Sequence, residues 1–473
     1  MGTVRRAAKN FLSLSIAQIV SQVILFMVVI YLARILGAAY FGKIAFAQAV
    51  VLYFSLIANL GLSTLGIREV ARNRNNIDGY VGNVLSLRLL LTAISFLLLL
   101  AFVAVIGKTL EVKYLIVLFG LSLFSAALWL GWLFQAVEKM GFIAWARILD
   151  KFLYGALIIL LVKNSRHLLT IPWLYVGGSL LASGFLIYIF IRKFGRPRLR
   201  FDFSLWKVMI RRALPMGAAF IMIQIYYNFD TVMLGFMKSD EVVGWYNAAY
   251  KVVLFTWAFI PIFVNVIFPL MSKYYQQSKK KLRLLISSAT RLMSSIGLPL
   301  GIGGTILARP IMSFLYGDKY MNGVIAFQIL IWTVAIISIR CAYEQSFLAC
   351  DREKRYLLGV TVGAGTNIVL NFILIPYFGL VGAAIATVIS ELVFSGYMLA
   401  HFQILKRVNI LKYLLKPFLA ASLMGVLLYY LRDLNLFFSI AIGIVVYLAA
   451  IWALKGVTWA ELKEVKMHVL ERS

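Results

Sequence analysis

The chain has 473 residues, of which 62% are hydrophobic and 14% are charged, and its formal net charge is +29. Soluble domains are about half apolar and a quarter charged, so this composition excludes a soluble protein and indicates an integral membrane protein. The basic residues are scattered over loops, which argues against nucleic-acid binding. The two cysteines, Cys341 and Cys350, predict neither a disulfide framework nor a metal site.

Apolar stretches long enough to cross a bilayer as helices recur along the whole chain. They lie at 11–33, 41–62, 83–106, 113–135, 145–163, 172–192, 214–237, 244–270, 285–308, 324–349, 357–376, 381–405, 415–431 and 436–454. We therefore predict an all-α polytopic membrane protein with about 14 transmembrane helices. The first stretch is longer than the core of a signal peptide and lacks a small-residue cleavage site, so we interpret it as a retained span.

The distribution of Lys and Arg predicts the orientation of these spans. An even number of spans leaves both termini on one side, and roughly 31 of the 47 basic residues fall on that side. Because basic loops stay in the cytoplasm, we expect both termini to be cytoplasmic and these loops to attract anionic lipid. Residues 193–213 form the longest cytoplasmic connection. We interpret it as a linker between two lobes, 1–192 and 214–405, although an ordinary basic loop is the alternative; residues 406–473 add two helices and a tail.

The two predicted lobes share short sequence matches in the same order. The matching pairs are 35–50 with 233–252, 87–95 with 290–297, and 134–139 with 347–352. The first pair has Leu-Gly and then a second glycine that opens a helix, and the second pair places Arg88 opposite Arg291. Six spans separate the copies, so the sequence predicts a parallel repeat with a central cavity between the lobes.

Several charged residues lie deep inside predicted spans, where a charge costs at least about 2.5–3.5 kcal/mol on insertion scales. Arg340 is about 13 Å from the nearer end of its span, and Glu344 follows it by four residues, so an intrahelical ion pair is the alternative to a functional role. Glu391 has no basic residue in its own span, which predicts either protonation or an ion pair across helices. For Asp230 and Lys251, in neighbouring spans, a structural ion pair is as well supported as substrate contact.

Charges nearer the span ends have a simpler explanation. Arg88 and Arg291 are each five or six residues inside a span, where snorkelling and cavity lining are equally supported. Arg147, Asp150 and Lys151 lie near the cytoplasmic end of one span. We expect the basic side chains there to snorkel, and Arg147 to pair with Asp150.

Polar side chains form stripes at helical spacing in four spans. The stripes consist of Ser15, Gln18 and Gln22; Gln224, Asn228 and Thr231; Asn247 and Lys251; and Asn367 and Asn371. One stripe is better explained by hydrogen bonds between packed helices. Four stripes together predict a hydrophilic cavity, whose wall would include Asp230.

The sequence lacks the usual signatures of an enzyme. The three histidines lie in a loop or near span ends, which predicts no metal cluster, and no G-x-x-x-x-G-K-[ST] run is present. The predicted outside loops are about 15 residues or shorter, too small for a catalytic domain. We therefore expect no enzymatic activity, no metal and no cofactor other than a coupling ion, H⁺ or Na⁺.

Four stretches in chain order carry a family resemblance. They are ARILGAAYFGKIAFAQAV (33–50), GLSTLGIREVAR (61–72), YYNFDTVMLGFMKSDEVVGWYNAAYKV (226–252) and IPYFGLVGAAIATVISE (375–391). Together they resemble the polysaccharide-transporter (O-antigen) flippases of the multidrug/oligosaccharidyl-lipid/polysaccharide exporter superfamily. The resemblance implies two six-helix bundles around a central cavity plus two C-terminal helices. It also implies alternating access, which would move a polyprenyl-diphosphate-linked oligosaccharide across the cell membrane of a prokaryote to the outer leaflet.

Under this resemblance the charged and polar residues inside the spans acquire expected roles, on the basis of depth and helical spacing. The expected headgroup and cavity residues are Arg88, Lys251, Arg291, Arg340, Gln18, Gln22, Asn228, Asn367 and Asn371. Arginine suits a diphosphate because its planar fork bonds two oxygens. The expected ion-coupling residues are Asp230, Glu344 and Glu391. The implied partners are the lipid-linked glycan, membrane lipid and polysaccharide polymerase machinery, and we expect a monomer.

Three other functions remain as alternatives. A cation-coupled drug exporter of the same superfamily would need an acidic and aromatic site, and the excess of basic residues within the spans argues against it. A membrane enzyme acting on lipid-linked sugars would need a catalytic constellation. A nonspecific lipid scramblase would need a polar groove but no central cationic cavity.

Overall fold

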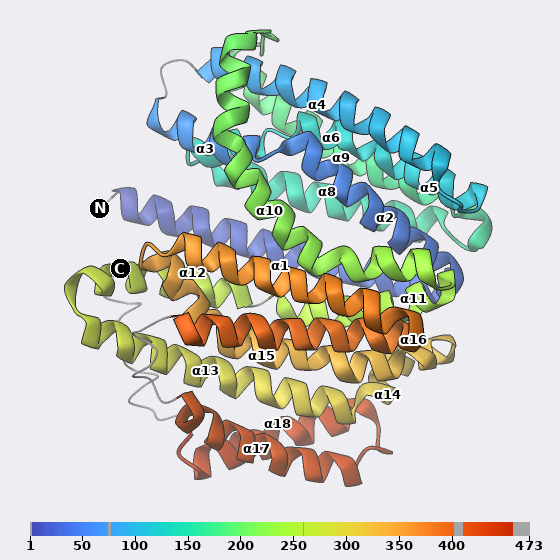
Figure 1. Ribbon diagram of the computed structural model, residues 1–473, viewed down its shortest axis with the longest axis vertical. Coiled ribbons are helices and arrows are strands. Elements are labelled where there is room, and N and C mark those ends of the chain that lie inside the picture. Colours follow the sequence, from blue (N-terminus) through green and yellow to red (C-terminus); the bar gives the residue numbers. More distant parts are fainter. Residues whose placement is uncertain (1, 74–76, 259, 402–409, 457–473) are drawn as a thin grey trace. The chain divides into compact units, whose positions relative to one another are not determined.

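The computed structural model describes residues 2–73, 77–258, 260–401 and 410–456, and this part of the chain is helical with short connections (Figure 1). In it, 10 segments are long and apolar enough to cross a membrane, or 11 if the bent pair 203–218 and 220–237 is one span. The prediction of an all-α multi-pass membrane protein is therefore confirmed.

The difference from the predicted 14 spans has identifiable reasons. Helices α8 (Met140–Leu161) and α11 (Asp240–Trp257) each carry three charged residues, which lowers their apolar character. Helix α16 (Glu353–His401) is one of the 10 segments, although it is long enough for two spans and is broken at Gly379, where φ is 55° and ψ is −127°. The finer count of 14 stays a prediction.

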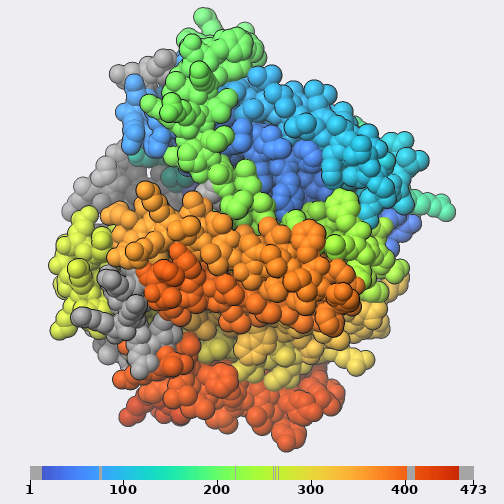
Figure 2. Space-filling model, viewed as in Figure 1, coloured from blue at the N-terminus to red at the C-terminus, as the bar shows by residue number. Residues whose placement is uncertain are grey.

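The two halves of α16 fold back on each other at this break (Figure 1). A Cβ added to Gly359, in the first half, would lie 2.6 Å from the methyl carbon of Met398 in the second. Close to the turn, a Cβ on Gly382 would lie 2.4 Å from the Leu374 carbonyl oxygen. Both glycines allow close helix approach, the usual role of small residues between membrane helices. The hairpin forms the orange surface in Figure 2 and matches the predicted spans 357–376 and 381–405.

The chain forms two compact units, Met1–Gly244 (unit 1) and Trp245–Ser473 (unit 2). In unit 1, α8 packs between α1 and α9, while α2 packs against α4, α5 and α10. The helices of this unit are α1 (Gly2–Leu36), α2 (Ala38–Asn59), α3 (Leu62–Arg72), α4 (Ile77–Val105), α5 (Leu110–Gly120), α6 (Ser122–Leu128), α7 (Gly131–Ala136), α8, α9 (Thr170–Phe194) and α10 (Phe203–Met237). A core of Leu, Val, Phe and Trp side chains joins α3, α4, α7, α9 and α10.

Unit 2 is built around α13, which packs against α12, α15 and α17. Its helices after α11 are α12 (Ile260–Gln277), α13 (Lys279–Ile306), α14 (Ala308–Tyr316), α15 (Val324–Ala349), α16, α17 (Ile410–Tyr430) and α18 (Leu436–Ala453). The last two helices are fixed to α13 by an apolar cluster and by the Tyr447 hydroxyl, which donates to the Ser295 carbonyl at 2.7 Å. The units divide inside α11, whereas the predicted lobes divide at 193–213, and that lobe division stays a prediction.

The glycines of the first sequence match meet at a close helix crossing. A Cβ added to Gly42 of α2 would lie 1.8 Å from the carbonyl oxygen of Asp240. A Cβ added to Gly244 of α11 would lie 2.0 Å from the carbonyl oxygen of Ala38. The contact is reciprocal: each glycine meets the backbone four residues before the other.

The third sequence match marks the same helix end in both copies. The Lys139 amide donates to the Phe134 carbonyl at 2.8 Å, and the Arg352 amide donates to the Phe347 carbonyl at 2.9 Å. The residue before each amide, Glu138 or Asp351, has a positive φ of 60° or 55°. These are the features of a Schellman helix end, with a carboxylate residue where glycine is usual.

We predict that Gly244→Ala weakens the helix crossing. The added methyl group overlaps the Ala38 carbonyl, so the two backbones must separate, and overpacking of this kind costs about 1–3 kcal/mol of unfolding free energy. Thermal unfolding of the purified protein measures the change. Gly184→Ala in α9 is the control, because nothing lies within 4 Å of its added Cβ. Equal unfolding temperatures for both variants would contradict the crossing.

Candidate functional site

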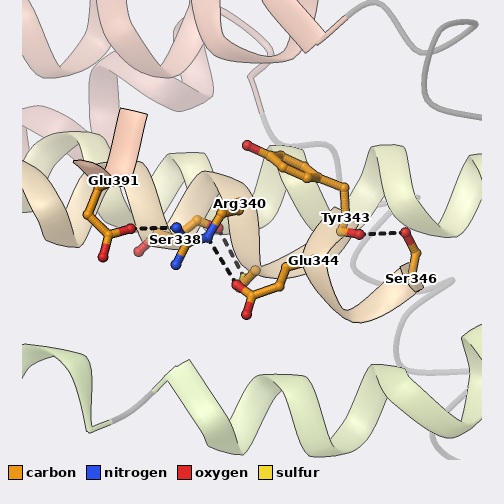
Figure 3. A network of polar contacts seen from close by, with 7 residues as sticks. Ser338, Arg340, Tyr343, Glu344, Ser346 and Glu391 are labelled. Carbon is orange, nitrogen blue, oxygen red and sulfur yellow. Dashed lines mark hydrogen bonds and ion pairs between the residues drawn. The ribbon is translucent and has the colours of Figure 1, made fainter. Parts of the chain in front are cut away.

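A buried charged cluster lies between α15 and the second half of α16 in unit 2 (Figure 3). The Arg340 guanidinium donates to Glu391 at 2.5 Å and to Glu344 at 3.0 Å. It also lies 4.1 Å from the centre of the Phe394 ring, a cation–π contact. Arg340 and Glu391 are each 1% exposed, and Glu344 is 14% exposed. The sequence alternatives of an intrahelical pair with Glu344 and a cross-helix pair for Glu391 are therefore both realised.

The ion pairs in this cluster offset part of the free-energy cost of burying its charges. An isolated charge in a membrane interior costs several kcal/mol, and an opposite charge at hydrogen-bonding distance offsets that cost. Arg340 has no further access to solvent, so in this conformation its guanidinium is engaged by the protein. Glu344 is the carboxylate of this cluster that is partly exposed to solvent, and the Tyr356 hydroxyl lies at hydrogen-bonding distance from it. With all three groups ionised, the cluster carries one negative charge.

Arg88 supports a broken span in unit 1. It is 5% exposed in α4, and its guanidinium donates to the carbonyl oxygens of Trp129 at 3.1 Å and Ala126 at 2.5 Å. These carbonyls lie at the break between α6 and α7, where Trp129 is extended at φ −68° and ψ 109°. A break inside the membrane frees carbonyl groups that need donors. Arg88 supplies them, so the structure gives it a positioning contact.

The other predicted headgroup cations have different surroundings. Arg291 of α13 is half-buried, with its guanidinium 5.1 Å from the centre of the Tyr413 ring of α17. Lys251 is half-buried in α11. Asp230 is 3% exposed in α10, close to Tyr53 of α2. Because Asp230 belongs to unit 1 and Lys251 to unit 2, an ion pair between them stays a prediction.

Two of the predicted polar stripes form side-chain hydrogen bonds within their own helices, and a third bonds to a neighbouring helix. Asn371 donates to the Asn367 side-chain oxygen at 2.9 Å, and both residues are 0% exposed. Asn228 donates to the Gln224 side chain at 3.1 Å. Gln18 is exposed on α1 and accepts from Arg147 of α8 at 3.1 Å. These contacts show polar groups inside the spans; cavity lining by them, and by Gln22, stays a prediction.

The charges of α8 differ from the sequence expectation. Asp150 pairs with Lys151 at 2.7 Å and not with Arg147, so the predicted Arg147–Asp150 pair is wrong. The reason is that Arg147 turns toward α1, where Gln18 accepts its hydrogen bond. The depth of Arg147 in the sequence favours snorkelling over a functional role.

Among the described residues, no group of three or more His, Cys, Asp and Glu side chains could hold a metal ion. Cys341 and Cys350 are free and buried. The arrangement offers buried and partly buried charges inside membrane spans, which suits movement of a charged solute.

A family model described as "Polysaccharide biosynthesis protein" matches residues 7–275, more than half of the chain. The chain belongs to this family. A putative O-antigen transporter of Shigella dysenteriae is 25% identical over 398 residues, covering 83% of this chain and 98% of its own. A putative O-antigen transporter of Escherichia coli is 24% identical, covering 83% and 95%. The family is one of transporters, as the sequence resemblance implies.

Solved structures share the fold of this family member. A lipid II flippase in an inward closed conformation superposes with a TM-score of 0.78 at 18% identity, covering 92% of this chain and 97% of its own. An inward-facing multidrug transporter of the MATE family superposes with a TM-score of 0.64 at 14% identity, covering 85% and 99%. At these identities the likeness shows the fold alone.

We predict that Arg340→Leu destabilises the protein and that adding Glu391→Leu restores most of the loss. The single change leaves the buried Glu391 carboxylate without its partner, which costs about 3–5 kcal/mol. The double change removes both fully buried charges and leaves only Glu344, which is partly exposed. Thermal unfolding of the two single variants and the double variant measures the coupling. Simple addition of the two single effects would contradict the buried pair.

Proposed function

We propose that this protein is a flippase that moves a polyprenyl-diphosphate-linked oligosaccharide from the cytoplasmic to the outer leaflet for cell-surface polysaccharide biosynthesis. The observation that carries this proposal is the similarity to putative O-antigen transporters along nearly their whole length. A shorter match, 32% identical over 173 residues, to a probable flippase of Haloferax volcanii supports flippase activity.

The physical requirement agrees with this assignment. A diphosphate sugar headgroup cannot cross hydrocarbon unaided, so its carrier needs a polar path inside the membrane. The family member places charged and amide side chains within its spans, in both units. We propose 14 spans in two six-helix lobes around a central cavity, two added helices and cytoplasmic termini, with a monomer as the working form and polymerase machinery as a partner.

Alternating access is the mechanism we propose for this path. The glycine crossing of α2 and α11 lies on the predicted outer side of the membrane, where a close contact without side chains would seal that side. The solved structures that share the fold include inward- and outward-facing transporters, which supports a fold able to adopt both states.

Coupling to an ion gradient is assigned to the acidic residues inside the spans. Glu344 is favoured because its carboxylate is partly exposed, whereas Glu391 is occupied by Arg340 and Asp230 is 3% exposed. The coupling ion would be H⁺ or Na⁺. For the headgroup, Lys251 and Arg291 stay candidates, while Arg88 and Arg340 are assigned positioning roles by their contacts.

A cation-coupled drug exporter is the second candidate, because MATE-family transporters share the fold. Transport in proteoliposomes separates the two. We expect a labelled polyprenyl-diphosphate oligosaccharide, placed in the outer leaflet, to become protected from an external sugar-modifying enzyme only when the protein is present. Export of an organic cation dye without any glycan protection would instead support the drug exporter, and protection of unrelated phospholipids at the same rate would support a scramblase.

We predict that Glu344→Gln removes the dependence of transport on the ion gradient, because an amide neither takes up a proton nor binds a cation by charge. Flipping rates with and without a proton or sodium gradient measure this effect. Glu353→Gln is the control, since Glu353 is exposed in the first turn of α16. A gradient response retained by Glu344→Gln would remove this residue from the coupling step.

A further inference from the structure

Helix α8 carries an arginine without an ion pair inside a membrane span. Arg147 is exposed, and among the described residues its one side-chain hydrogen bond is to Gln18 at 3.1 Å. The neighbouring charges cancel each other, because Lys151 pairs with Asp150 at 2.7 Å and stacks 5.4 Å from the Tyr175 ring. Arg147 therefore supplies the net positive charge of this helix.

The position of Arg147 on the helix excludes a lipid-facing side chain. Trp145, Phe152 and Ile159 recur at seven-residue spacing and are 68%, 60% and 47% exposed, which marks the apolar face of α8. At about 100° per residue, Arg147 lies about 200° from Trp145. It shares its face with Tyr154, which is 3% exposed. The exposed guanidinium thus lies on the side of α8 opposite its apolar face.

Helix α1 lines the same side with polar groups. It packs along α8, and its Ile24 and Val28 side chains lie 3.2 and 3.1 Å from a Cβ built on Gly155. The stripe of Ser15 and Gln18 lies further toward the N-terminus of α1, at the level of Arg147. A cation on a face away from lipid, beside polar side chains, requires water or an anion as its partner.

We propose that Arg147, oriented by Gln18, binds the phosphate groups of the lipid-linked substrate in unit 1. The identity of the ligand rests on the proposed flippase function, whereas the anion site rests on the geometry alone. A guanidinium presents two parallel N–H donors to phosphate oxygens, and one donor is fixed by Gln18. Lys151 is a weaker partner, because Asp150 already neutralises it. The headgroup would therefore meet its cation in α8 and not at Arg340.

A cysteine placed beside the site tests this assignment without removing the arginine. Ser15→Cys lies one helical turn before Gln18 on α1, and the native Cys341 and Cys350 are buried. A charged, membrane-impermeant thiol reagent modifies only a thiolate in water. In open membrane fragments, we expect Ser15→Cys to react, and Phe152→Cys on the apolar face of α8 to remain unmodified.

Ligand protection then identifies the anion. We expect undecaprenyl diphosphate to slow modification of Ser15→Cys, and undecaprenol to have no effect. Adding Arg147→Gln should raise the protecting concentration about tenfold or more, since a hydrogen bond to a charged group contributes about 1.5–3 kcal/mol. Arg147→Lys should recover part of the protection. Arg192→Gln, at the end of α9, is the control that should keep it.

Three outcomes would overturn the proposal. Ser15→Cys could prove as unreactive as Phe152→Cys, which would show that this face is dry. Protection could persist unchanged in the Arg147→Gln variant, which would place the ligand elsewhere. Phosphatidylglycerol could protect as well as the diphosphate, which would make this a general phospholipid site. The readout needs no transport, so a failure of flipping with protection intact would count against the proposed function and not against the anion site.

Discussion

The need to neutralise charge within apolar spans governs this structure. A charge in a membrane interior costs several kcal/mol unless it has a partner, and every charged residue in a span must therefore be paired, solvated or placed at an end. Arg340 and Glu391 satisfy this need by direct contact, and Arg88 satisfies it with backbone carbonyls. Arg147 satisfies it by facing away from lipid. The same constraint that stabilises the first three leaves the fourth available to a ligand.

The Arg340 cluster and helix α8 differ in the sign of their net charge. With all groups ionised, the cluster of Arg340, Glu344 and Glu391 in unit 2 carries one negative charge, and α8 in unit 1 carries one positive charge. The proposed phosphate-binding residue Arg147 and the proposed coupling residue Glu344 thus belong to different units.

Features of the fold and of the charged cluster that depend on local spacing along the chain could be predicted from the sequence. Apolar length gave the membrane class, and the four-residue spacing of Arg340 and Glu344 gave their pair. The repeat matches were also informative: the paired glycines meet, and the acid–base pairs mark equivalent helix ends. What failed depends on tertiary contacts. The break that Arg88 supports, and the turn of Arg147 toward α1, have no signal in the spacing of charges.

One signal for Arg147 was nevertheless present. The apolar residues at 145, 152 and 159 define the lipid face of that helix, and Arg147 lies on the opposite side. The depth of Arg147 in its span, taken without the face of the helix on which it lies, predicts snorkelling. Charges in membrane helices are better assigned from both coordinates together, because a snorkelling side chain and a site residue can share the same depth.

The measurement that tests the account most directly is the flipping rate of Arg147→Gln in proteoliposomes, beside Arg147→Lys, Arg192→Gln and the parent protein. We expect Arg147→Gln to lose at least about tenfold in rate at limiting substrate, Arg147→Lys to keep part of it, and Arg192→Gln to match the parent. Parental transport by a correctly folded Arg147→Gln protein would contradict the claim that the unpaired charge meets the substrate.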